Sequence, residues 1–343
     1  MPRRAEPTRW RRAAARVLAA TGLVLCTTGA HAEAQPTVPT LQLAFVGDIM
    51  LDDGPGQTIA QGRDPLAGVA PALRRSDFAI GNLECPIATT GQPLPNKVYS
   101  FRAHPRVTEV LRGRFQALSV ANNHAGDHGP EAFLETLAHV RRAGIQPFGG
   151  GANLREAHAP VWLEKHGIRV AVLAYNEFKP RQFEAGPEWP GIAWSEDEQV
   201  VRDIRAARAA GADWVIPFMH WGWENETEPS ARQRQLARTL IDAGADLVVG
   251  GHPHLVQGAE SYQGKPIVYS LGNFVFDGFD QPINRQGWLL RLTLSKDRLL
   301  AWDTLLTETD DAGSPHLRPG VRTPCGQPGP LGPASVVGHC SPP

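Results

Sequence analysis

Leu41-Gln-Leu-Ala-Phe-Val-Gly-Asp48 is an apolar run that ends, after a glycine, in a carboxylate. A short apolar run followed by Gly and a polar residue is typical of a buried parallel strand. The same pattern recurs in residues 77–84, 117–124, 213–220 and 246–254. In open α/β sheets, ligands bind outside the carboxyl ends of the strands. These endings, which together supply Asp, Glu, Asn and His, therefore predict one polar centre built at strand tips.

Helical and strand-like patterns alternate after residue 40. Several predicted helices begin at a proline and end just before a glycine, which is a helix-boundary signature. The predicted helices are 65–75, 105–112, 130–143, 196–210 and 229–243. A hairpin is predicted over 161–174, turning at His166-Gly167, and strands over 266–270, 287–294 and 299–306. This order predicts one α/β domain, residues 41–308, in which sheet packs on sheet with helices outside.

The two ends of the chain differ from this domain. Residues 1–32 combine six arginines, an apolar stretch over 17–30 and the small-residue pattern Ala30-His31-Ala32, which predicts a signal peptide and a periplasmic or secreted protein. The alternatives are a retained membrane anchor and lipidation at Cys26. Residues 33–40 read as a linker. Residues 309–343 are rich in Pro, Gly and Ser, so we expect a tail without helix or strand.

Charge and cysteine content limit the partners and the compartment. The chain has 34 Lys and Arg against 35 Asp and Glu, and removal of residues 1–32 leaves 28 against 34. A mildly acidic protein argues against nucleic acid or an anionic membrane as partner. For Cys325 and Cys340 in the tail, we expect a disulfide that stabilises by about 3 kcal/mol. Cys85 is expected to be a buried free thiol.

Histidines and carboxylates at the strand tips are the candidate metal ligands. His252-Pro253-His254 follows a Gly-Gly turn that would let both imidazoles reach one centre. Asp48 and Glu84 would supply the anionic oxygens that a dinuclear site needs. Each residue alone has an ordinary explanation, such as a surface His pair, a helix cap or a salt bridge. A metal site is favoured because all of those explanations would have to hold separately.

Two further segments carry polar groups of interest. Asn123-His124 could place a phosphate-binding amide beside a proton donor, with Asp127 orienting the imidazole. The alternative is an Asn-rich turn that caps the next helix. His220-Trp-Gly-Trp223-Glu224 ends another apolar run, where Trp223 and Glu224 could contact a substrate or belong only to the surface.

Short motifs between residues 41 and about 280 occur in a recognisable order and spacing. They are Gly47-Asp48-Ile49-Met50, Gly81-Asn82-Leu83-Glu84, Lys97-Val-Tyr-Ser-Phe101-Arg102, Ala121-Asn122-Asn123-His124-Ala-Gly-Asp127, His220-Trp221-Gly222-Trp223-Glu224, Gly251-His252-Pro253-His254 and Ser270-Leu271-Gly272-Asn273-Phe274. Together they resemble the bacterial CapA capsule-synthesis family. That family is similar to a branch of the calcineurin-like metallophosphatases, so the resemblance implies a four-layer α/β/β/α sandwich of that type.

The resemblance also implies roles for individual residues. Two divalent ions, such as Mn, Fe or Zn, would be bound, with Glu84 in the bridging position. The implied metal ligands are Asp48, Glu84, Asn123, His220, His252 and His254. His124, oriented by Asp127, would be the general acid. The candidate substrate contacts are Asn82, Lys97, Arg102, Trp223 and Glu224. Two departures weaken the first metal position: Met50 stands where the family has His, and Asn82 and Glu84 stand where it has Asp.

Two functions follow from this resemblance. The first is an exported, metal-dependent phosphoester hydrolase of capsule or poly-γ-glutamate synthesis that uses a metal-bound hydroxide. The alternative is a non-catalytic component that binds an anionic polymer or a membrane-bound synthase and keeps a structural metal centre. A third possibility is a nucleotidase or sugar-phosphate hydrolase unrelated to capsule. Loss of turnover in a folded His252→Ala variant would favour an enzyme, whereas loss of stability would favour the structural role.

Overall fold

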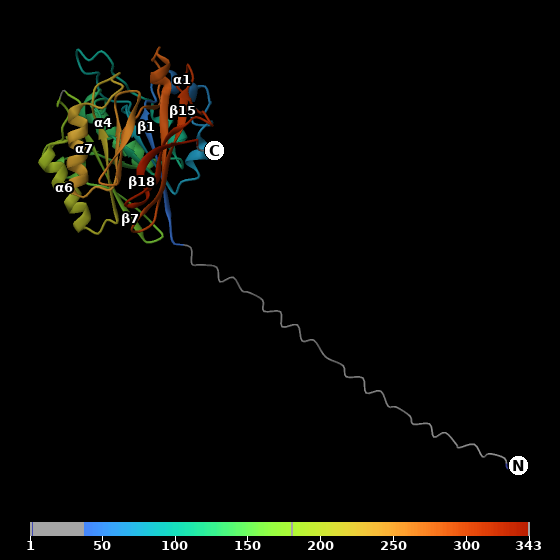
Figure 1. The fold of residues 1–343 in the computed structure, drawn as a ribbon. Helices are drawn as coiled ribbons and strands as arrows, with labels where there is room; N and C mark the ends of the chain where they lie inside the picture. The colour runs from blue at the N-terminus through green and yellow to red at the C-terminus, as the bar shows by residue number, and fades with distance from the viewer. Residues whose placement is uncertain (1, 3–37, 180, 342–343) are drawn as a thin grey trace. The chain divides into compact units, whose positions relative to one another are not determined.

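The computed structural model describes residue 2, residues 38–179 and residues 181–341. In this part of the chain the strands form two large sheets and one two-stranded sheet (Figure 1). The predicted signal peptide lies almost entirely outside the described residues, and so does most of the 33–40 linker. Among the residues that are described, no helix is both long and apolar enough to cross a membrane.

The first large sheet has ten strands and contains the three N-terminal runs. Its parallel strands are β1 (Leu41–Ile49), β2 (Phe78–Leu83), β3 (Ala117–Ser119), β4 (Gln146–Phe148) and β13 (Asn273–Val275). Its antiparallel part consists of β14 (Gln286–Leu294), β15 (Leu299–Thr309), β16 (Pro315–Leu317), β17 (Thr323–Gly329) and β18 (Gly332–Cys340). The carboxyl ends of β1, β2 and β3 therefore meet at one edge.

The second large sheet has six strands and contains the other two runs. In spatial order its strands are β11 (Val256–Tyr262), β12 (Lys265–Leu271), β10 (Val248–Gly251), β9 (Trp214–His220), β7 (Ile168–Asn176) and β6 (Val161–Lys165). Strands β7, β9, β10 and β12 are parallel, so their carboxyl ends also share one edge. The small sheet pairs β5 (Gly150–Gly151) with β8 (Gly191–Ile192).

Alternation along the strands shows how the layers stack. On β1, Leu43 and Phe45 face a core shared with the second sheet, whereas Ala44 and Val46 face a core shared with helices. The helices outside the first sheet are α1 (Asp53–Ala60), α2 (Ala70–Leu73), α3 (Thr108–Leu111) and α4 (Gly129–Arg142). Outside the second sheet lie α5 (Leu154–Ala157), α6 (Asp197–Ala209) and α7 (Ala231–Ala243), and short 3₁₀ turns occupy Pro105–Val107 and Pro282–Arg285. The predicted four-layer α/β/β/α sandwich is confirmed.

The long predicted helices agree with α4, α6 and α7 to within two residues. Helix α7 begins at a capping box formed by Ser230 and Gln233 and ends at Gly244, which has a φ of 119°. The predicted hairpin over 161–174 is confirmed as β6 and β7. The helix predicted over 65–75 is wrong in extent, since only the short α2 forms there. The residues before α2 form separate turns, and Leu66 N donates a hydrogen bond to the Asp64 side chain.

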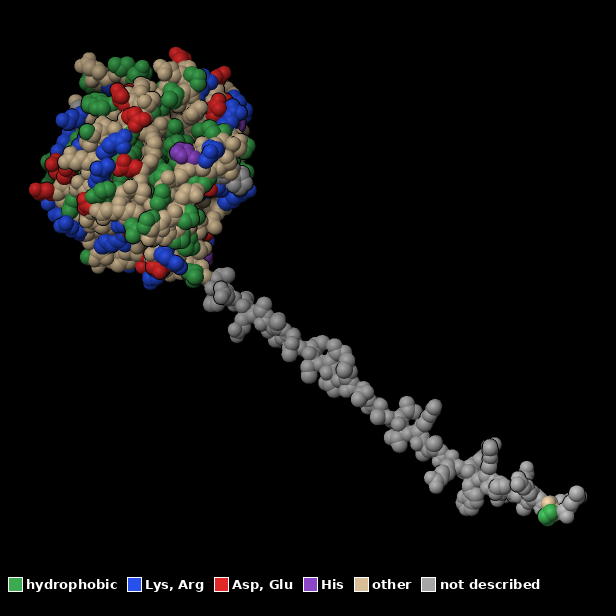
Figure 2. Space-filling model, in the orientation of Figure 1, with side chains coloured by type: hydrophobic (Ala, Val, Ile, Leu, Met, Phe, Trp, Pro, Cys, Tyr) green, Lys and Arg blue, Asp and Glu red, His purple; other side chains and the backbone are tan. Residues whose placement is uncertain are grey.

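The surface mixes charges of both signs. On the face drawn in Figure 2, Lys and Arg side chains are interspersed with Asp and Glu. Ion pairs between opposite charges are frequent among the described residues; Arg291 and Asp303, on neighbouring strands, form one of them. This face therefore carries no extended basic surface.

The expectation that residues after 309 lack regular structure is wrong. Strands β16, β17 and β18 extend the first sheet at its edge. β17 lies between β18 and β15 and pairs with β15 only at Asp303 and Cys325, so Pro324 stands where the ladder to one neighbour is already incomplete. Gly326 lies flat on Trp302, whose ring would be 2.6 Å from an added Cβ, and the Trp302 indole donates to Ala334 O at 3.2 Å. The sequence pattern of neighbouring residues does not reveal these long-range contacts.

The hairpin of β17 and β18 contains a disulfide between Cys325 and Cys340, fifteen residues apart in the sequence. We expect the Cys325→Ser/Cys340→Ser variant to lose about 3 kcal/mol of unfolding free energy, because the closed loop restricts the unfolded chain. Urea denaturation of both proteins measures this loss. Wild-type protein kept in reductant should match the variant, since Cys85, the other cysteine among the described residues, is buried and unpaired. Equal stability of all three samples would show that the strand ladder alone holds the hairpin.

Candidate metal centre

The strand tips of both large sheets meet at one place. Asp48 lies in β1 beside Asn82 of β2, and Glu84 follows β2 directly. In the other sheet, His220 at the end of β9 lies beside Gly251 of β10. A Cβ added to Gly251 would lie 3.0 Å from Asp48 Oδ1, so only glycine lets the two sheets approach this closely. The predicted polar centre is therefore shared by the two sheets.

His252 and His254 follow β10 in an uncommon backbone conformation. Their φ angles are 96° and 57°, in the left-handed region that residues other than glycine rarely adopt. Such strain persists where the surroundings fix it, and it often marks a functional site. His254 Nδ1 lies 2.9 Å from Asn273 Oδ1, so the ring donates there and presents Nε2 to Glu84 Oε1 at 3.9 Å. The His-Pro-His turn thus directs both imidazoles into the centre.

Three donor atoms lie near His220 Nε2, at distances close to those between neighbouring ligands of a tetrahedral site. This atom lies 2.7 Å from Asn123 Oδ1, 3.1 Å from His252 Nδ1 and 3.4 Å from Glu84 Oε1. For ligand bonds of about 2.0–2.1 Å in a tetrahedral site, neighbouring donors lie roughly 3.3 Å apart. The donor atoms of Glu84, His220 and His252 also lie within 4.8 Å of one another, so this group can hold one cation, with Asn123 Oδ1 beside it.

A second group shares Glu84 with the first. Asp48, Glu84 and His254 offer donor atoms that all lie within 4.8 Å of one another, as do Glu224, His252 and His254. Glu84 thus occupies the position of a carboxylate between two cation sites. Of the predicted substrate contacts, Glu224 is exposed but lies close enough to be grouped with the two histidines.

Two buried atoms of this cluster have no hydrogen-bond partner among the described residues. They are Glu84 Oε1 and His252 Nε2. Burial, followed by the charge of Asp48, raises the pKa of Glu84 well above its usual range. Burial, followed by neighbouring histidines, lowers the pKa of His220 and His252 well below the usual value. A buried carboxylate with an unpartnered oxygen, beside buried imidazoles of which one nitrogen is unpartnered, is a donor set that a divalent cation would satisfy, so the residues present fit such an ion.

Asn82 supports the ligands, although a substrate contact was expected. It is 2% exposed, and its Nδ2 lies 2.8 Å from Asp48 Oδ1 and 3.4 Å from Glu84 Oε2. Its Oδ1 accepts from Asn122 Nδ2 at 3.0 Å. Both ends of the amide are therefore occupied by protein groups, and the side chain fixes the two carboxylates.

His124 and Asp127 lie together beside Asn123, as predicted. His124 Nδ1 is 2.8 Å from Asp127 Oδ2, and Asp127 also accepts from Phe101 N at 2.8 Å. Burial lowers the pKa of His124, against the opposing effect of Asp127. The Nε2 atom of His124 has no hydrogen-bond partner among the described residues, so this edge of the ring is free to meet a substrate.

Arg102 and Trp223 do not join the cluster. The Arg102 guanidinium donates to the carbonyl oxygens of Thr90 and Gly91 at 3.2 and 3.1 Å, and so it fixes a loop. Trp223 is 61% exposed and meets the edge of Phe178. Lys97 does reach the site, where its ammonium contacts Asp127 and Asn123 O.

Met50 is buried and takes no part in the donor groups. Its sulfur accepts from Asp52 N at 3.1 Å, and the side chain is 1% exposed. The Asp48 group therefore has fewer nitrogen donors than the His220 group. This difference predicts unequal affinity at the two positions.

Three supporting residues were not assigned a role from the sequence. Asn122 fixes the amide of Asn82, Asn273 fixes His254, and the Phe178 ring lies 3.9 Å from the His252 ring and covers it. The Gly-Asn ending of the run before Asn273 resembles the other strand tips and could have identified it. Phe178 follows β7 after Asn176 and Glu177 and carries no polar signal, so nothing in the pattern marks it.

The sequence matches known proteins over most of its length. Residues 42–278 match the family model described as "Bacterial capsule synthesis protein PGA_cap". The chain is 35% identical over 253 residues to the "PGA biosynthesis protein CapA" of Bacillus subtilis, covering 72% of this chain and 64% of that one. It is 32% identical over 269 residues to the "Capsule biosynthesis protein CapA" of Bacillus anthracis, covering 76% and 62%. This chain thus spans less than two thirds of either relative.

Solved structures show more distant likeness. A hypothetical protein from Thermus thermophilus is 16% identical with a TM-score of 0.49, covering 78% of this chain and 99% of that one. The NAD nucleotidase of Haemophilus influenzae is 12% identical with a TM-score of 0.46, covering 82% and 54%. These identities are too low to indicate a shared activity. By the family match over residues 42–278, the chain belongs to the bacterial capsule synthesis protein PGA_cap family.

Proposed function

We propose that this protein is a metal-dependent phosphoester hydrolase that acts in the synthesis of a cell-surface polymer. The carrying observation is that Glu84 is shared by two groups of buried metal-ligand atoms, with the His124–Asp127 pair beside them. The part in polymer synthesis is supported by relatives named for PGA and capsule biosynthesis. Export is part of the proposal and rests on residues 1–32, which lie largely outside the described residues.

The proposed ligands divide into two sets that share one residue. One cation would be held by Glu84, Asn123, His220 and His252, and the other by Asp48, Glu84 and His254. Divalent ions in these positions would lower the pKa of a bound water and offset charge on phosphoryl oxygens. Asn82 and Asn273 keep the ligands in place through the hydrogen bonds described above.

His124 is the residue proposed to move a proton. Asp127 accepts a hydrogen bond from Nδ1 of His124. Nε2 lies on the other side of the ring and has no protein partner among the described residues. An approaching phosphoryl anion favours the imidazolium, which then donates from Nε2 to the leaving oxygen. Asp127 stabilises that charge and fixes the ring. Lys97 in turn fixes Asp127.

A non-catalytic assembly role is the second candidate, and Met50 favours it. Its sulfur is bonded to Asp52 N, and the donor group around Asp48 is the poorer of the two. A single retained ion would then be structural, and the protein would act by binding a polymer or a membrane-bound synthase.

Metal content and turnover together test the proposal. The full chain is loaded with Mn²⁺, its metal is measured by elemental analysis, and phosphate release is followed from p-nitrophenyl phosphate and bis(p-nitrophenyl) phosphate. We expect two ions per chain, one of which dialyses away more readily, and turnover that needs both. The His252→Ala variant should lose metal and turnover, whereas His316→Ala, at an exposed tail residue paired with Asp310, should lose neither.

The other outcomes separate the two candidates. One tightly held ion without turnover on either ester would support the assembly role. Turnover that persists in metal-free His252→Ala protein would contradict both candidates, because both assign His252 to the metal.

A further inference from the structure

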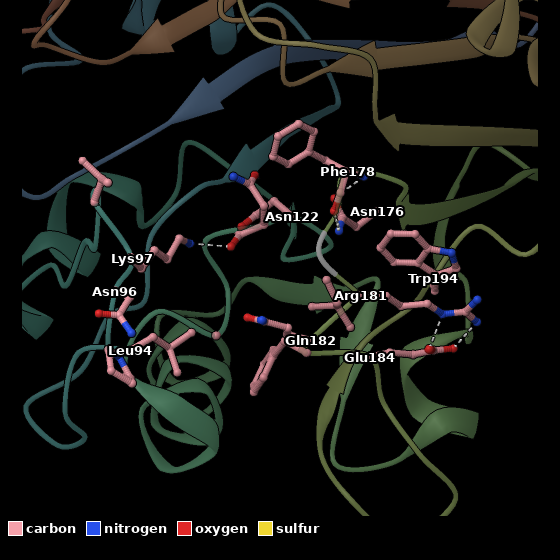
Figure 3. A pocket seen from close by; sticks show the side chains of 16 residues that line it. Leu94, Asn96, Lys97, Asn122, Asn176, Phe178, Arg181, Gln182, Glu184 and Trp194 are labelled. Atoms are coloured by element: carbon pink, nitrogen blue, oxygen red, sulfur yellow. Dashed lines mark hydrogen bonds and ion pairs between the residues drawn. The ribbon is translucent and has the colours of Figure 1, made fainter.

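A cavity of about 460 Å³ opens directly beside the metal centre. Asn123, whose Oδ1 contacts His220, forms part of its wall, and so does Phe178, which covers His252. Figure 3 shows Asn96 and Lys97 on one side and Arg181, Glu184 and Trp194 on the other. A cavity of this size holds a small organic molecule. Under the proposed function, it is the place for the organic part of the phosphoester.

Lys97 is one of two cationic side chains that line this cavity, and its charge is already neutralised. Its ammonium pairs with the buried carboxylate of Asp127, donates to Asn123 O at 2.7 Å and lies 3.4 Å from His124 Nδ1. An ammonium has three N–H donors. Two of them meet Asp127 and Asn123 O, and the Asp127 carboxylate balances the charge, so Lys97 offers a substrate anion no unpaired positive charge.

Arg181 is the other cationic side chain, and it is more than neutralised. Its guanidinium makes a bidentate pair with Glu184 and a further bond of 2.8 Å from Nη1 to Glu196. The same group lies 5.2 Å from the ring centre of Trp194, which fixes its plane. One positive charge thus faces two carboxylates, of which Glu184 lines the cavity and Glu196, outside the lining, is 60% exposed.

The polar groups left for a ligand are uncharged. The side-chain amides of Asn96 and Gln182 line the cavity, are exposed and have no hydrogen-bond partner among the described residues. Apolar walls come from Phe178, Phe183 and Trp194. Amides beside aromatic surfaces suit a ring that carries hydroxyl or amide groups.

We propose that this cavity binds the uncharged, hydroxyl- or amide-bearing ring of a phosphoester, such as a neutral sugar, and selects against a second anionic group. The inference rests on the proposed function and names the substrate class for the same site. An anionic group in the cavity would meet Glu184, which together with Glu196 outweighs the charge of Arg181, and no unpaired cation is among the described residues that line the cavity. A polyanionic chain is therefore a poor occupant of this cavity.

Binding of two matched sugar phosphates tests the proposal. Glucose 1-phosphate and glucuronic acid 1-phosphate differ only by a carboxylate in place of a hydroxymethyl group. Calorimetry with the Mn²⁺-loaded full chain should show glucose 1-phosphate bound roughly fivefold or more tightly than the glucuronate. In Glu184→Gln protein the preference should fall toward equality, because Arg181 is then balanced by one carboxylate. Glu198→Gln, at an 88% exposed side chain on α6 outside the cavity, should keep the wild-type preference.

Inorganic phosphate separates failure of this inference from failure of the proposed function. If phosphate binds but the two sugar phosphates bind equally, or the glucuronate binds better, the cavity proposal is overturned and the metal site stands. If phosphate fails to bind the metal-loaded protein, the proposed function fails, and the cavity proposal fails with it. The wild-type preference is decisive even if Glu184→Gln does not fold.

Discussion

Glu84→Gln is expected to raise the melting temperature of the metal-free protein and to lower that of the metal-loaded protein. Without metal, Glu84 is a fully buried carboxylate beside Asp48, and one of its oxygens has no partner. A neutral amide of the same shape removes that repulsion, which is worth about 1–3 kcal/mol. With metal, the amide cannot bridge two cations, so stabilisation by binding, about 4 kcal/mol at a thousandfold excess over Kd, is lost. Thermal melts in Mn²⁺ and in chelator measure both changes in melting temperature.

The pH dependence of this difference follows from the raised pKa of Glu84. In the unfolded chain the carboxyl loses its proton near the ordinary pKa of 4.5, whereas burial in the folded chain raises the pKa above that value. The folded state then holds the proton longer, so this residue destabilises the metal-free protein increasingly as pH rises above 4.5. The advantage of Glu84→Gln in chelator should vanish below that pH and grow as the pH rises above it.

The control for Glu84→Gln is Glu109→Gln, at an exposed residue of α3. It should leave both melting temperatures unchanged. A loss of stability in Glu84→Gln that is equal with and without metal would assign Glu84 a purely structural role.

The positions of the proposed metal ligands could be predicted from the sequence for a simple reason. Asp48, His220 and His252 each end or follow a buried run, and the carboxyl ends of parallel strands meet at a sheet edge. The runs also set the two-sheet packing, since Leu43 and Phe45 alternate with Ala44 on opposite faces of β1. The hydrophobic periodicity therefore predicts that a residue belongs to a strand, which face of the sheet it occupies and whether it lies at the end of the strand.

The partner of each side chain could not be predicted in the same way. Arg102 and Lys97 are both cationic and lie near the same motif, yet the first binds the carbonyls of a loop and the second binds Asp127. Asn82 follows the strand-tip pattern of a ligand but donates to the carboxylates. The choice depends on contacts between residues far apart in the sequence, which no local pattern contains.

The C-terminal strands show the same limit at the level of the fold. Gly326 and Pro324 argue against a strand when their neighbours are unknown. In the folded chain, Trp302 needs a residue without a Cβ beside its ring, and the incomplete ladder between β15 and β17 tolerates the proline. Tertiary packing thus overrides local propensity in β17.

His124→Asn is expected to lower phosphate release by about 10²–10⁴-fold while both metal ions are retained. His124 is not one of the proposed ligands, and its Nε2 has no protein partner among the described residues, so the loss should fall on turnover. Asp127→Asn should cause a smaller loss, because the ring keeps a hydrogen-bond partner of the same size but loses the carboxylate that stabilises its charge. Elemental analysis and steady-state kinetics of each variant measure the two effects separately.

The identity of the leaving group decides whether His124 donates a proton. p-Nitrophenolate leaves without protonation, whereas an alkoxide needs a proton in the transition state. The loss in His124→Asn should therefore be much larger for an alkyl phosphate than for p-nitrophenyl phosphate. His139→Asn, on the outer helix α4 and paired with Glu135, should leave both substrates unaffected. Equal losses on both substrates would show that His124 positions the phosphoryl group and does not act as the acid.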